Sequence, residues 1–351
     1  MAEPANIVVY GAGAIGGQIA VRLARAGLDP TVVEPWTPQR EAIRAHGLVV
    51  RDEQSGAEER ADLRVVAPGE LGGPVGILFL CVKSYDTLEA LTVVKPLLDA
   101  DSLVVSMQNS INEEWIAPEV GAERVVGGVI LVNGSFLEPG RVQASSSVSR
   151  ATASADLPGV YVGEHEAPAD KNARRVAGVL DHVWPSQSID DLAHERWSKM
   201  VNNTMLDPVS AIGGMKSAEL LANADARRLA VRLAAETMRV AEAEGHPLSV
   251  ILGEYAAEDV YATAAGDTDA VERALADRAH RVSPSAMTSM YQDVQRKRRT
   301  EIDYFSGLVA QKGAGHGIPT PHCDIVTRLV HDVESGALTP SPSAVRQALH
   351  D

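Results

Sequence analysis

A short apolar run that passes directly into a glycine-rich turn constrains this chain more than any other feature. The run Ile-Val-Val-Tyr at residues 7–10 leads into Gly-Ala-Gly-Ala-Ile-Gly at residues 11–16, and helix-forming residues continue over residues 18–26. This order predicts a strand, a tight turn and a helix. It is typical of a dinucleotide-binding fold, although the glycine pattern by itself also fits a chance turn.

Each glycine of the turn has its own steric task in such a fold. Gly11 permits the sharp turn, Gly13 lacks the Cβ that would block a phosphate, and Gly16 lets helix and strand pack closely. The N–H groups at the start of the helix then face the negative charge of a pyrophosphate. The residues expected to contact the cofactor here are Gly11, Ala12, Gly13, Ala14, Ile15 and Gly16.

A second apolar run, over residues 30–33, ends in Glu34. A carboxylate at this position accepts hydrogen bonds from the two ribose hydroxyls and repels a 2′-phosphate, so we expect NAD in preference to NADP. An exposed strand end is the alternative interpretation of Glu34. Arg40, a few residues further on, keeps NADP open because a guanidinium could hold the phosphate.

Charge and cysteine content exclude several classes of protein. The 351 residues carry a formal net charge of −15, which argues against nucleic acid or an anionic membrane as partner and favours a small molecule. Cys81 and Cys323 are too few to form a disulfide framework. The histidines lack the spacing of metal ligands, so no metal is expected.

The beginning of the sequence bears on location. Residues 1–4 lack a basic n-region, and we therefore expect a cytoplasmic protein.

The periodicity of apolar residues changes near residue 188. Continuous apolar runs, typical of buried parallel strands, occur at residues 75–82, 102–107 and 124–131, and β-like runs follow over 140–163. Helical spacing prevails later, at residues 192–205, 218–245, 284–312 and 319–335, and residues 337–351 resemble a polar tail without a core. We predict an α/β fold with a Rossmann dinucleotide-binding domain (1–188) and an all-α domain (189–351).

Three polar stretches are candidates for chemistry. Lys83 and Asn109 each follow the carboxyl end of a predicted strand, where open α/β sheets bind ligands. Lys199, Asn203 and Asp207 recur every four residues and would form one stripe on a helix, able to grip a polar substrate. From spacing alone, a solvated helix face is the favoured interpretation of that stripe. The run over residues 289–307 suggests another solvated basic helix, in which Glu301 falls where side chains turn inward.

Together these stretches resemble the ketopantoate reductases of the ApbA/PanE type. The most specific match is Ser-Met-x-Gln-Asp … Thr-Glu-Ile-Asp … Gly, which begins at Ser289 and ends at Gly307. The others are the glycine turn, Cys81-Val82-Lys83, Gln108-Asn109, and Lys199 with Asn203. The resemblance spans nearly the whole chain and implies an active site in a cleft between two domains, a homodimer, and hydride transfer between a nicotinamide and a 2-keto acid.

The resemblance also implies roles for individual residues. Lys199 would be the general acid and base, and Glu301 would orient the nicotinamide ribose or the substrate oxygens. Asn109 would lie where cofactor and substrate meet, and Lys83 would help to hold a 2′-phosphate. The remaining roles are substrate contact for Asn203 and Ser289 and backbone contact with the cofactor for Gly134.

This chain departs from the family pattern in both halves. No arginine follows the second strand, Asp207 and Ser217 stand where the family uses asparagines toward the substrate, and Ser110 replaces a glycine. A carboxylate at Asp207 would oppose an anionic keto acid, so we expect a small 2-keto or 2-hydroxy acid other than ketopantoate. An NAD-linked enzyme would favour alcohol oxidation. The alternatives are oxidation of another secondary alcohol, and a non-catalytic dinucleotide sensor, against which Lys199 and Glu301 argue.

Overall fold

The computed structural model describes residues 6–145, 158–165 and 168–350. The chain forms two compact units, Met1–Ala193 and His194–Asp351. The expected boundary at residue 188 lies five residues before this division, at the end of the last strand of the first unit. Residues 1–4, on which the expected location of the protein depends, lie outside the described residues. So do residues 146–157, which are part of the β-like run predicted over 140–163.

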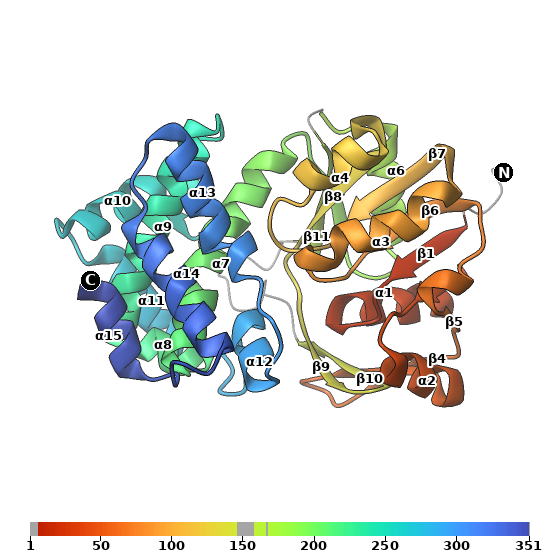
Figure 1. Ribbon diagram of the computed structural model, residues 1–351, viewed down its shortest axis with the longest axis horizontal. Helices are drawn as coiled ribbons and strands as arrows, with labels where there is room; N and C mark the ends of the chain where they lie inside the picture. The colour runs from red at the N-terminus through yellow and green to blue at the C-terminus, as the bar shows by residue number, and fades with distance from the viewer. Residues whose placement is uncertain (1–5, 146–157, 166–167, 351) are drawn as a thin grey trace. The chain divides into compact units, whose positions relative to one another are not determined.

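An eight-stranded sheet, in the order β12-β11-β8-β7-β6-β1-β2-β5, is the frame of the first unit (Figure 1). Its strands are β1 (Ile7–Tyr10), β2 (Thr31–Val33), β5 (Arg64–Val66), β6 (Val75–Leu80), β7 (Leu98–Ser106), β8 (Val125–Ile130), β11 (Val160–Glu164) and β12 (Ser186–Ser188). β1 pairs in parallel with β2 on one side and β6 on the other, so the strand order reverses at β1. In open α/β sheets the ligand lies outside the carboxyl ends of the strands at such a reversal.

Both faces of this sheet are covered, which explains why its central strands are apolar throughout. One apolar cluster joins the sheet to α1 (Ala14–Arg25) and α6 (Lys171–Leu180), and a second joins it to α3 (Thr87–Val94) and α4 (Glu113–Val120). A separate four-stranded sheet packs on α1. That sheet consists of β3 (Leu48–Asp52), β4 (Glu58–Ala61), β9 (Asn133–Glu138) and β10 (Arg141–Ser145).

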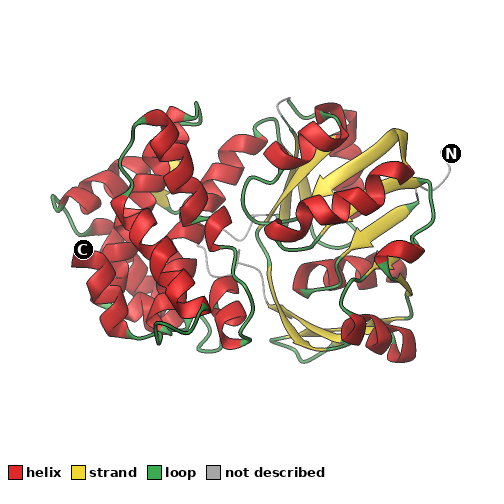
Figure 2. Ribbon diagram, in the orientation of Figure 1, coloured by secondary structure: helices red, strands yellow, loops and turns green. Residues whose placement is uncertain are grey.

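The second unit is helical, as expected (Figure 2). Besides the short α12, described below, its α-helices are α7 (Leu192–Gly213, which begins in the first unit), α8 (Ser217–Ala222), α9 (Ala224–Ala243), α10 (Ala257–Ala265), α11 (Ala270–Ala279), α13 (Ser306–His316), α14 (Pro321–Glu334) and α15 (Pro342–His350). The buried α9 is at its centre and packs against α8, α10, α11, α13, α14 and α15.

The prediction of an all-α second domain omits a short hairpin, β13 (Val250–Ile251) with β14 (Tyr255–Ala256). Its two turn residues, Leu252 and Gly253, both have positive φ, 46° and 70°. The backbone N–H of Leu252 donates to Ser198 Oγ at 2.7 Å and thereby ties the turn to α7. A positive φ is costly for a leucine, and periodicity gave no sign of it.

Two predicted helical segments are interrupted. The side chain of Asn223 accepts a hydrogen bond from the backbone of Ala226, which starts α9 and separates it from α8. The segment over 284–312 contains only the seven-residue α12 (Ser289–Gln295), the 3-10 turn η5 (Ile302–Tyr304) and α13. The basic run that we expected on a solvated helix is an exposed turn in which Lys297 has a φ of 53°.

The prediction of a polar tail after residue 336 is wrong. Residues Pro342–His350 form α15, which packs against α9 and α14. Its buried side chains are Ala344, Val345, Ala348 and Leu349. These four residues follow helical spacing, but the segment is short and interleaved with polar residues, so its amphipathic face was easy to overlook.

Both cysteines are unpaired and inside the protein. Cys81 follows β6 and is half-buried, and Cys323 is fully buried in the first turn of α14. Cys81 packs closely on the glycine turn. A Cβ added to Gly16 would lie 2.9 Å from the Cβ of Cys81. Burial raises the pKa of both thiols.

No described helix is both long and apolar enough to cross a lipid bilayer. Nor do three His, Cys, Asp or Glu side chains of the described ranges converge in a way that could hold a metal ion.

Candidate functional site

The glycine turn after β1 has the shape that a pyrophosphate requires. Gly11 has a φ of 95°, and a Cβ on Gly16 would lie 1.9 Å from the carbonyl oxygen of Gly11. In contrast, there is open space at Gly13. Apart from the adjoining residues, no described atom lies within 4 Å of the position that a Cβ on Gly13 would take. Gly13 begins α1 and offers no side-chain cap, so this helix start is suited to an anion.

Glu34 is buried directly against this turn, with an exposed fraction of 6%. Its Oε2 accepts a hydrogen bond from the backbone N–H of Ala12, and its Oε1 accepts one from the backbone N–H of Trp36, both at 2.8 Å. The alternative interpretation of Glu34 as an exposed strand end is therefore wrong. The carboxylate is fixed by two donors, and its position matches that of an acid that binds the adenosine ribose.

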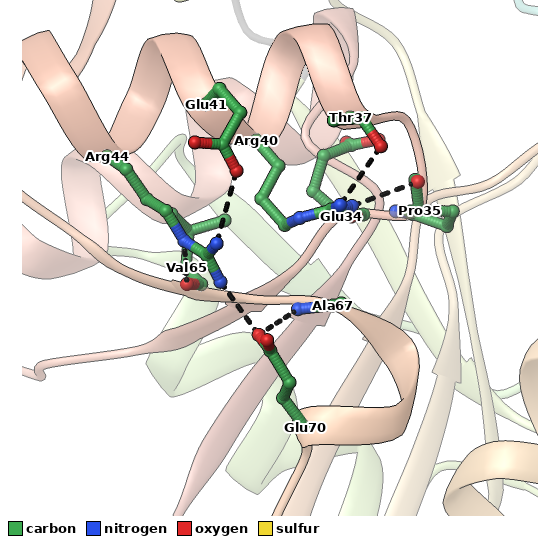
Figure 3. Close-up of polar contacts among 9 residues, drawn as sticks. All are labelled: Glu34, Pro35, Thr37, Arg40, Glu41, Arg44, Val65, Ala67 and Glu70. Atoms are coloured by element: carbon green, nitrogen blue, oxygen red, sulfur yellow. Dashed lines mark hydrogen bonds and ion pairs between the residues drawn. The ribbon is translucent and has the colours of Figure 1, made fainter.

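Arg40 stabilises the chain that follows Glu34 (Figure 3). Its Nη1 donates to the carbonyl oxygens of Glu34 and Pro35 at 2.7 and 3.0 Å, and its Nη2 donates to Thr37 Oγ1 at 3.0 Å. The sequence left Arg40 open as a possible cation for a 2′-phosphate. In the structure, three of its donor contacts hold the turn between β2 and α2 (Thr37–His46).

Sequence reasoning missed Gln39, a buried amide in α2. Its Nε2 donates to the carbonyl oxygen of Ala12, and its Oε1 accepts from the backbone N–H of Gly140, both at 2.7 Å. Gln39 thus connects the glycine turn to the turn between β9 and β10. Gly134 lies on β9. A Cβ added to it would lie 3.1 Å from the carbonyl oxygen of Ala14, so Gly134 lies beside the start of α1.

The loops after β6 and β7 are joined by buried amides. Asn112 Nδ2 donates to Ser84 Oγ at 3.2 Å and also to the carbonyl oxygen of Asn109. Gln108 Nε2 donates to the carbonyl oxygen of Val82 at 3.0 Å. These bonds fix Asn109 at the carboxyl edge of the sheet, as the strand pattern predicted.

Two further residues of these loops have informative backbones. Lys83 follows Val82 at the same edge and begins the 3-10 turn η2 (Ser84–Asp86). Ser110, which stands where the resemblance expects glycine, has a φ of 73°, a conformation that glycine adopts freely and serine seldom does. Strain of this kind is commonly retained next to functional groups.

A second polar cluster lies on one face of α7. Arg196, Lys199, Asn203 and Asp207 follow one another at intervals of three or four residues. Lys199 is half-buried and the other three are buried, so a solvated helix face is excluded. Arg196 was not predicted, although its distance from Lys199 along the helix would have shown it.

Asn203 has the clearest unfilled hydrogen-bonding capacity in this cluster. Its Nδ2 is buried and has no hydrogen-bond partner among the described residues. A buried donor without a partner is costly, and a ligand oxygen would satisfy it. This feature agrees with the predicted contact between Asn203 and a substrate.

The environment of Lys199 lowers the pKa of its ammonium group to about 7. Burial is the main cause, and the positive charge of Arg196 adds to it, whereas the negative charges of Asp207 and Glu301 oppose it. Near neutral pH, such a lysine can both give and accept a proton. Glu301, buried at the start of η5, therefore acts on Lys199 electrostatically across a long sequence separation.

The structure gives Asp207 a different environment from the one we expected. Its Oδ1 accepts hydrogen bonds from Ser289 Oγ at 2.7 Å and from the backbone N–H of Met290 at 2.9 Å, and so fastens the first turn of α12 to α7. Asp207 and Ser289, both expected to face the substrate, are thus bonded to each other. Ser217 begins α8, where its N–H donates to the carbonyl oxygen of Ala286.

Comparison with known families accounts for both units. Residues 7–155 match the family model of ketopantoate reductase PanE/ApbA, and residues 191–334 match the model of its C-terminal domain. The chain belongs to the ketopantoate reductase family. Members of this family are NAD(P)-dependent oxidoreductases, and the chain is an enzyme of that kind.

Individual members of the ketopantoate reductase family are similar over almost their whole length. The 2-dehydropantoate 2-reductase of Archaeoglobus fulgidus is 29% identical over 336 residues, which cover 94% of this chain and 98% of the relative. That of Lactococcus lactis is 27% identical over 338 residues, with the same coverage. The N-terminal Rossmann domain and helical C-terminal domain predicted from the sequence are therefore confirmed.

Solved structures show the same fold. A PanE/ApbA family ketopantoate reductase from Ralstonia eutropha has a TM-score of 0.75 at 24% identity, covering 94% of this chain and 99% of that chain. A D-mandelate dehydrogenase, solved as a complex with NADH, has a TM-score of 0.75 at 25% identity, covering 95% and 100%.

Proposed function

We propose that this enzyme transfers a hydride between NAD(H) and a small 2-keto or 2-hydroxy acid, with Lys199 as its general acid and base. A bound dinucleotide would supply or accept the hydride at the substrate carbon. Lys199 Nζ gives a proton to the carbonyl oxygen during reduction and takes the hydroxyl proton during oxidation. Its positive charge also stabilises the negative charge that develops on that oxygen.

One observation supports this proposal above all others. Lys199 lies on a buried polar face between Arg196 and two carboxylates, with the unsatisfied amide of Asn203 one turn away. A proton donor next to an unfilled hydrogen-bond donor is suited to a substrate with neighbouring carbonyl and carboxylate oxygens. A dinucleotide sensor would need neither group, and enzymatic activity is the family's property.

The hydrogen bonds of Asp207 change our expectation about the substrate. We had expected its charge to oppose an anionic keto acid, but two donors already compensate one of its oxygens. We therefore propose that Asp207 and Ser289 position α12, that the charge of Asp207 adjusts the pKa of Lys199, and that Asn203 and Asn109 contact the substrate. Ketopantoate returns to the set of candidates, beside other 2-keto acids and other secondary alcohols.

NAD is the proposed cofactor because Glu34 directs a carboxylate at the ribose position. Its two backbone donors hold it in place, and Arg40 is engaged with backbone oxygens on the same turn. NADH is the cofactor in the D-mandelate dehydrogenase complex, which is 25% identical to this chain. Lys83 remains the residue that would favour NADP.

A substrate panel tests this proposal. We expect NADH-dependent reduction of ketopantoate or another 2-keto acid such as the one derived from D-mandelate, and NAD-dependent oxidation of the matching 2-hydroxy acid. Initial rates should be measured in both directions, with NADH and NADPH in parallel. Activity confined to simple secondary alcohols would support the alternative substrate class. No turnover of any substrate, despite tight NADH binding, would contradict the proposal.

The rates should depend on pH in opposite senses for the two directions. Reduction needs protonated Lys199, so its kcat/KM should fall as the pH rises through about 7, whereas oxidation needs the neutral amine and should gain rate over the same range. Because the charge of Glu301 raises the pKa of Lys199, Glu301→Gln should move both midpoints to lower pH. Identical midpoints in parent and variant would exclude this coupling.

A further inference from the structure

The turn that carries Glu301 determines how strongly this carboxylate acts on Lys199. Glu301 immediately precedes η5 and is 4% exposed, and its charge raises the pKa of Lys199. The attraction between a carboxylate and an ammonium weakens as their separation grows, and it is strongest away from water. The proton affinity of Lys199 therefore depends on what holds this turn in place.

Helix α14 contacts the turn on both sides of Glu301. Glu334 Oε1 accepts a hydrogen bond from the backbone N–H of Thr300, the residue before Glu301, at 2.6 Å. His331 Nε2 lies 2.8 Å from Oδ1 of Asp303, which follows Glu301 within η5. The other oxygen of Glu334, Oε2, lies 3.0 Å from His331 Nδ1 and so joins the two contacts into one network.

The ring of His331 is a bridge between two carboxylates. Its two nitrogens can both donate hydrogen bonds only when the ring is protonated. Burial disfavours that charge, but the hydrogen bonds and negative charges of Glu334 and Asp303 outweigh it and raise the pKa of His331. Arg299 Nη2 donates to the second oxygen of Asp303 at 3.2 Å. Charge-assisted hydrogen bonds of this kind are stronger than neutral ones, so they fasten the turn to α14.

Helix stability does not explain why a carboxylate stands at position 334. Glu334 is the last residue of α14, and the helix dipole disfavours a negative charge at that end. Its side chain is nevertheless only 19% exposed, and it is bonded to Thr300 and His331. The placement of Glu334 is thus accounted for by the turn that it binds.

We propose that His331 and Glu334 are positioning residues, which hold the turn over residues 300–303 and thereby keep the Glu301 carboxylate where its charge acts on Lys199. The inference rests on the proposed function and deepens it, since it adds two residues of α14 to the control of the acid–base group. Neither residue is among the charges of the described chain that set the pKa of Lys199. Their influence therefore passes through the turn.

The titration of Lys199 itself tests this inference without any substrate. Full-length protein labelled with ¹³C at the lysine Cε should be titrated by NMR, and the resonance absent from Lys199→Ala identifies Lys199. We expect His331→Ala and Glu334→Ala to move its midpoint to lower pH, by no more than Glu301→Gln does, because a loosened turn weakens the attraction of Glu301. In the Glu301→Gln background, His331→Ala should cause no further shift, because the neutral amide has no charge to misplace.

His316→Ala provides the matched control. Like His331, His316 is an accessible histidine near the end of a helix and contacts a glutamate, Glu244, but it belongs to α13. Its replacement should leave the midpoint of Lys199 at the parent value. Glu334→Gln keeps an oxygen that can accept from the N–H of Thr300, so its midpoint should lie closer to the parent value than that of Glu334→Ala.

The possible results separate this inference from the proposed function. A merely structural role of His331 and Glu334 would lower the thermal stability of the alanine variants and leave the midpoint of Lys199 unchanged, which would overturn the inference alone. Additive shifts from His331→Ala and Glu301→Gln would do the same. If Glu301→Gln has no effect, the inference fails together with the proposed coupling. A parent Lys199 that titrates like an ordinary exposed lysine would contradict the proposed function itself.

Discussion

Lys199→Ala should lower kcat for reduction by about 10²- to 10⁴-fold while leaving the dissociation constant of NADH within about twofold of the parent value. General acid catalysis contributes a factor of this size, and alanine can neither give a proton nor stabilise charge on the substrate oxygen. The dinucleotide residues lie on other elements, so the variant should still bind cofactor. Stopped-flow measurement of hydride transfer and fluorescence titration with NADH would separate the two effects.

A control is available in the same unit. Lys297 is exposed in the turn after α12, so Lys297→Ala removes an equal charge without touching the α7 cluster. It should leave kcat within about twofold of the parent value. If Lys199→Ala retained parental turnover and the parental pH profile, Lys199 would have no part in proton transfer.

Glu34→Arg should shift the ratio of kcat/KM values for NADPH and NADH by about 100-fold toward NADPH. The variant loses the charged acceptor for the ribose hydroxyls and gains a cation for the 2′-phosphate, and each charge-assisted hydrogen bond is equivalent to about a factor of ten. Because Glu34 also accepts from Ala12 and Trp36, the total activity should fall as well. Steady-state kinetics with both cofactors measures the ratio.

Glu41→Arg is the matched control for this change. Glu41 is exposed on α2, where its carboxylate contacts Arg44, so its replacement makes the same change in net charge away from Ala12 (Figure 3). The cofactor ratio should stay within about twofold of the parent value. An unchanged ratio in Glu34→Arg, or an equal shift in Glu41→Arg, would remove Glu34 as the determinant of cofactor choice.

The parts of the fold that could be predicted are those set by local sterics and by periodicity. The turn at Gly11 needs a φ of 95°, and the apolar run in β6 needs cover on both faces; each demand leaves a pattern in adjacent residues. Helix α15 was missed because its apolar face is only four residues, and the segment around Lys297 because a turn can contain the same charges as a solvated helix.

The site was predictable only in outline. Lys199, Asn203 and Asp207 could be placed on one face because helical spacing is regular, and the role of Lys199 came from the family resemblance. The bond between Asp207 and Ser289 joins residues 82 positions apart, and the bond between Gln39 and Gly140 spans 101 positions. Tertiary contacts of this kind leave no mark in residue spacing, so the actual partners of Asp207 could not be read from the sequence.

The thiols of half-buried Cys81 and buried Cys323 determine how the protein should respond to oxidants. Peroxides and alkylating reagents react with thiolates, and the raised pKa of Cys81 and Cys323 leaves almost no thiolate at neutral pH. The folded enzyme should therefore tolerate aerobic handling without a reducing agent. Since each cysteine lies in a different unit, the rate at which a reagent labels each one would report separately on the local opening of the dinucleotide-binding and helical halves.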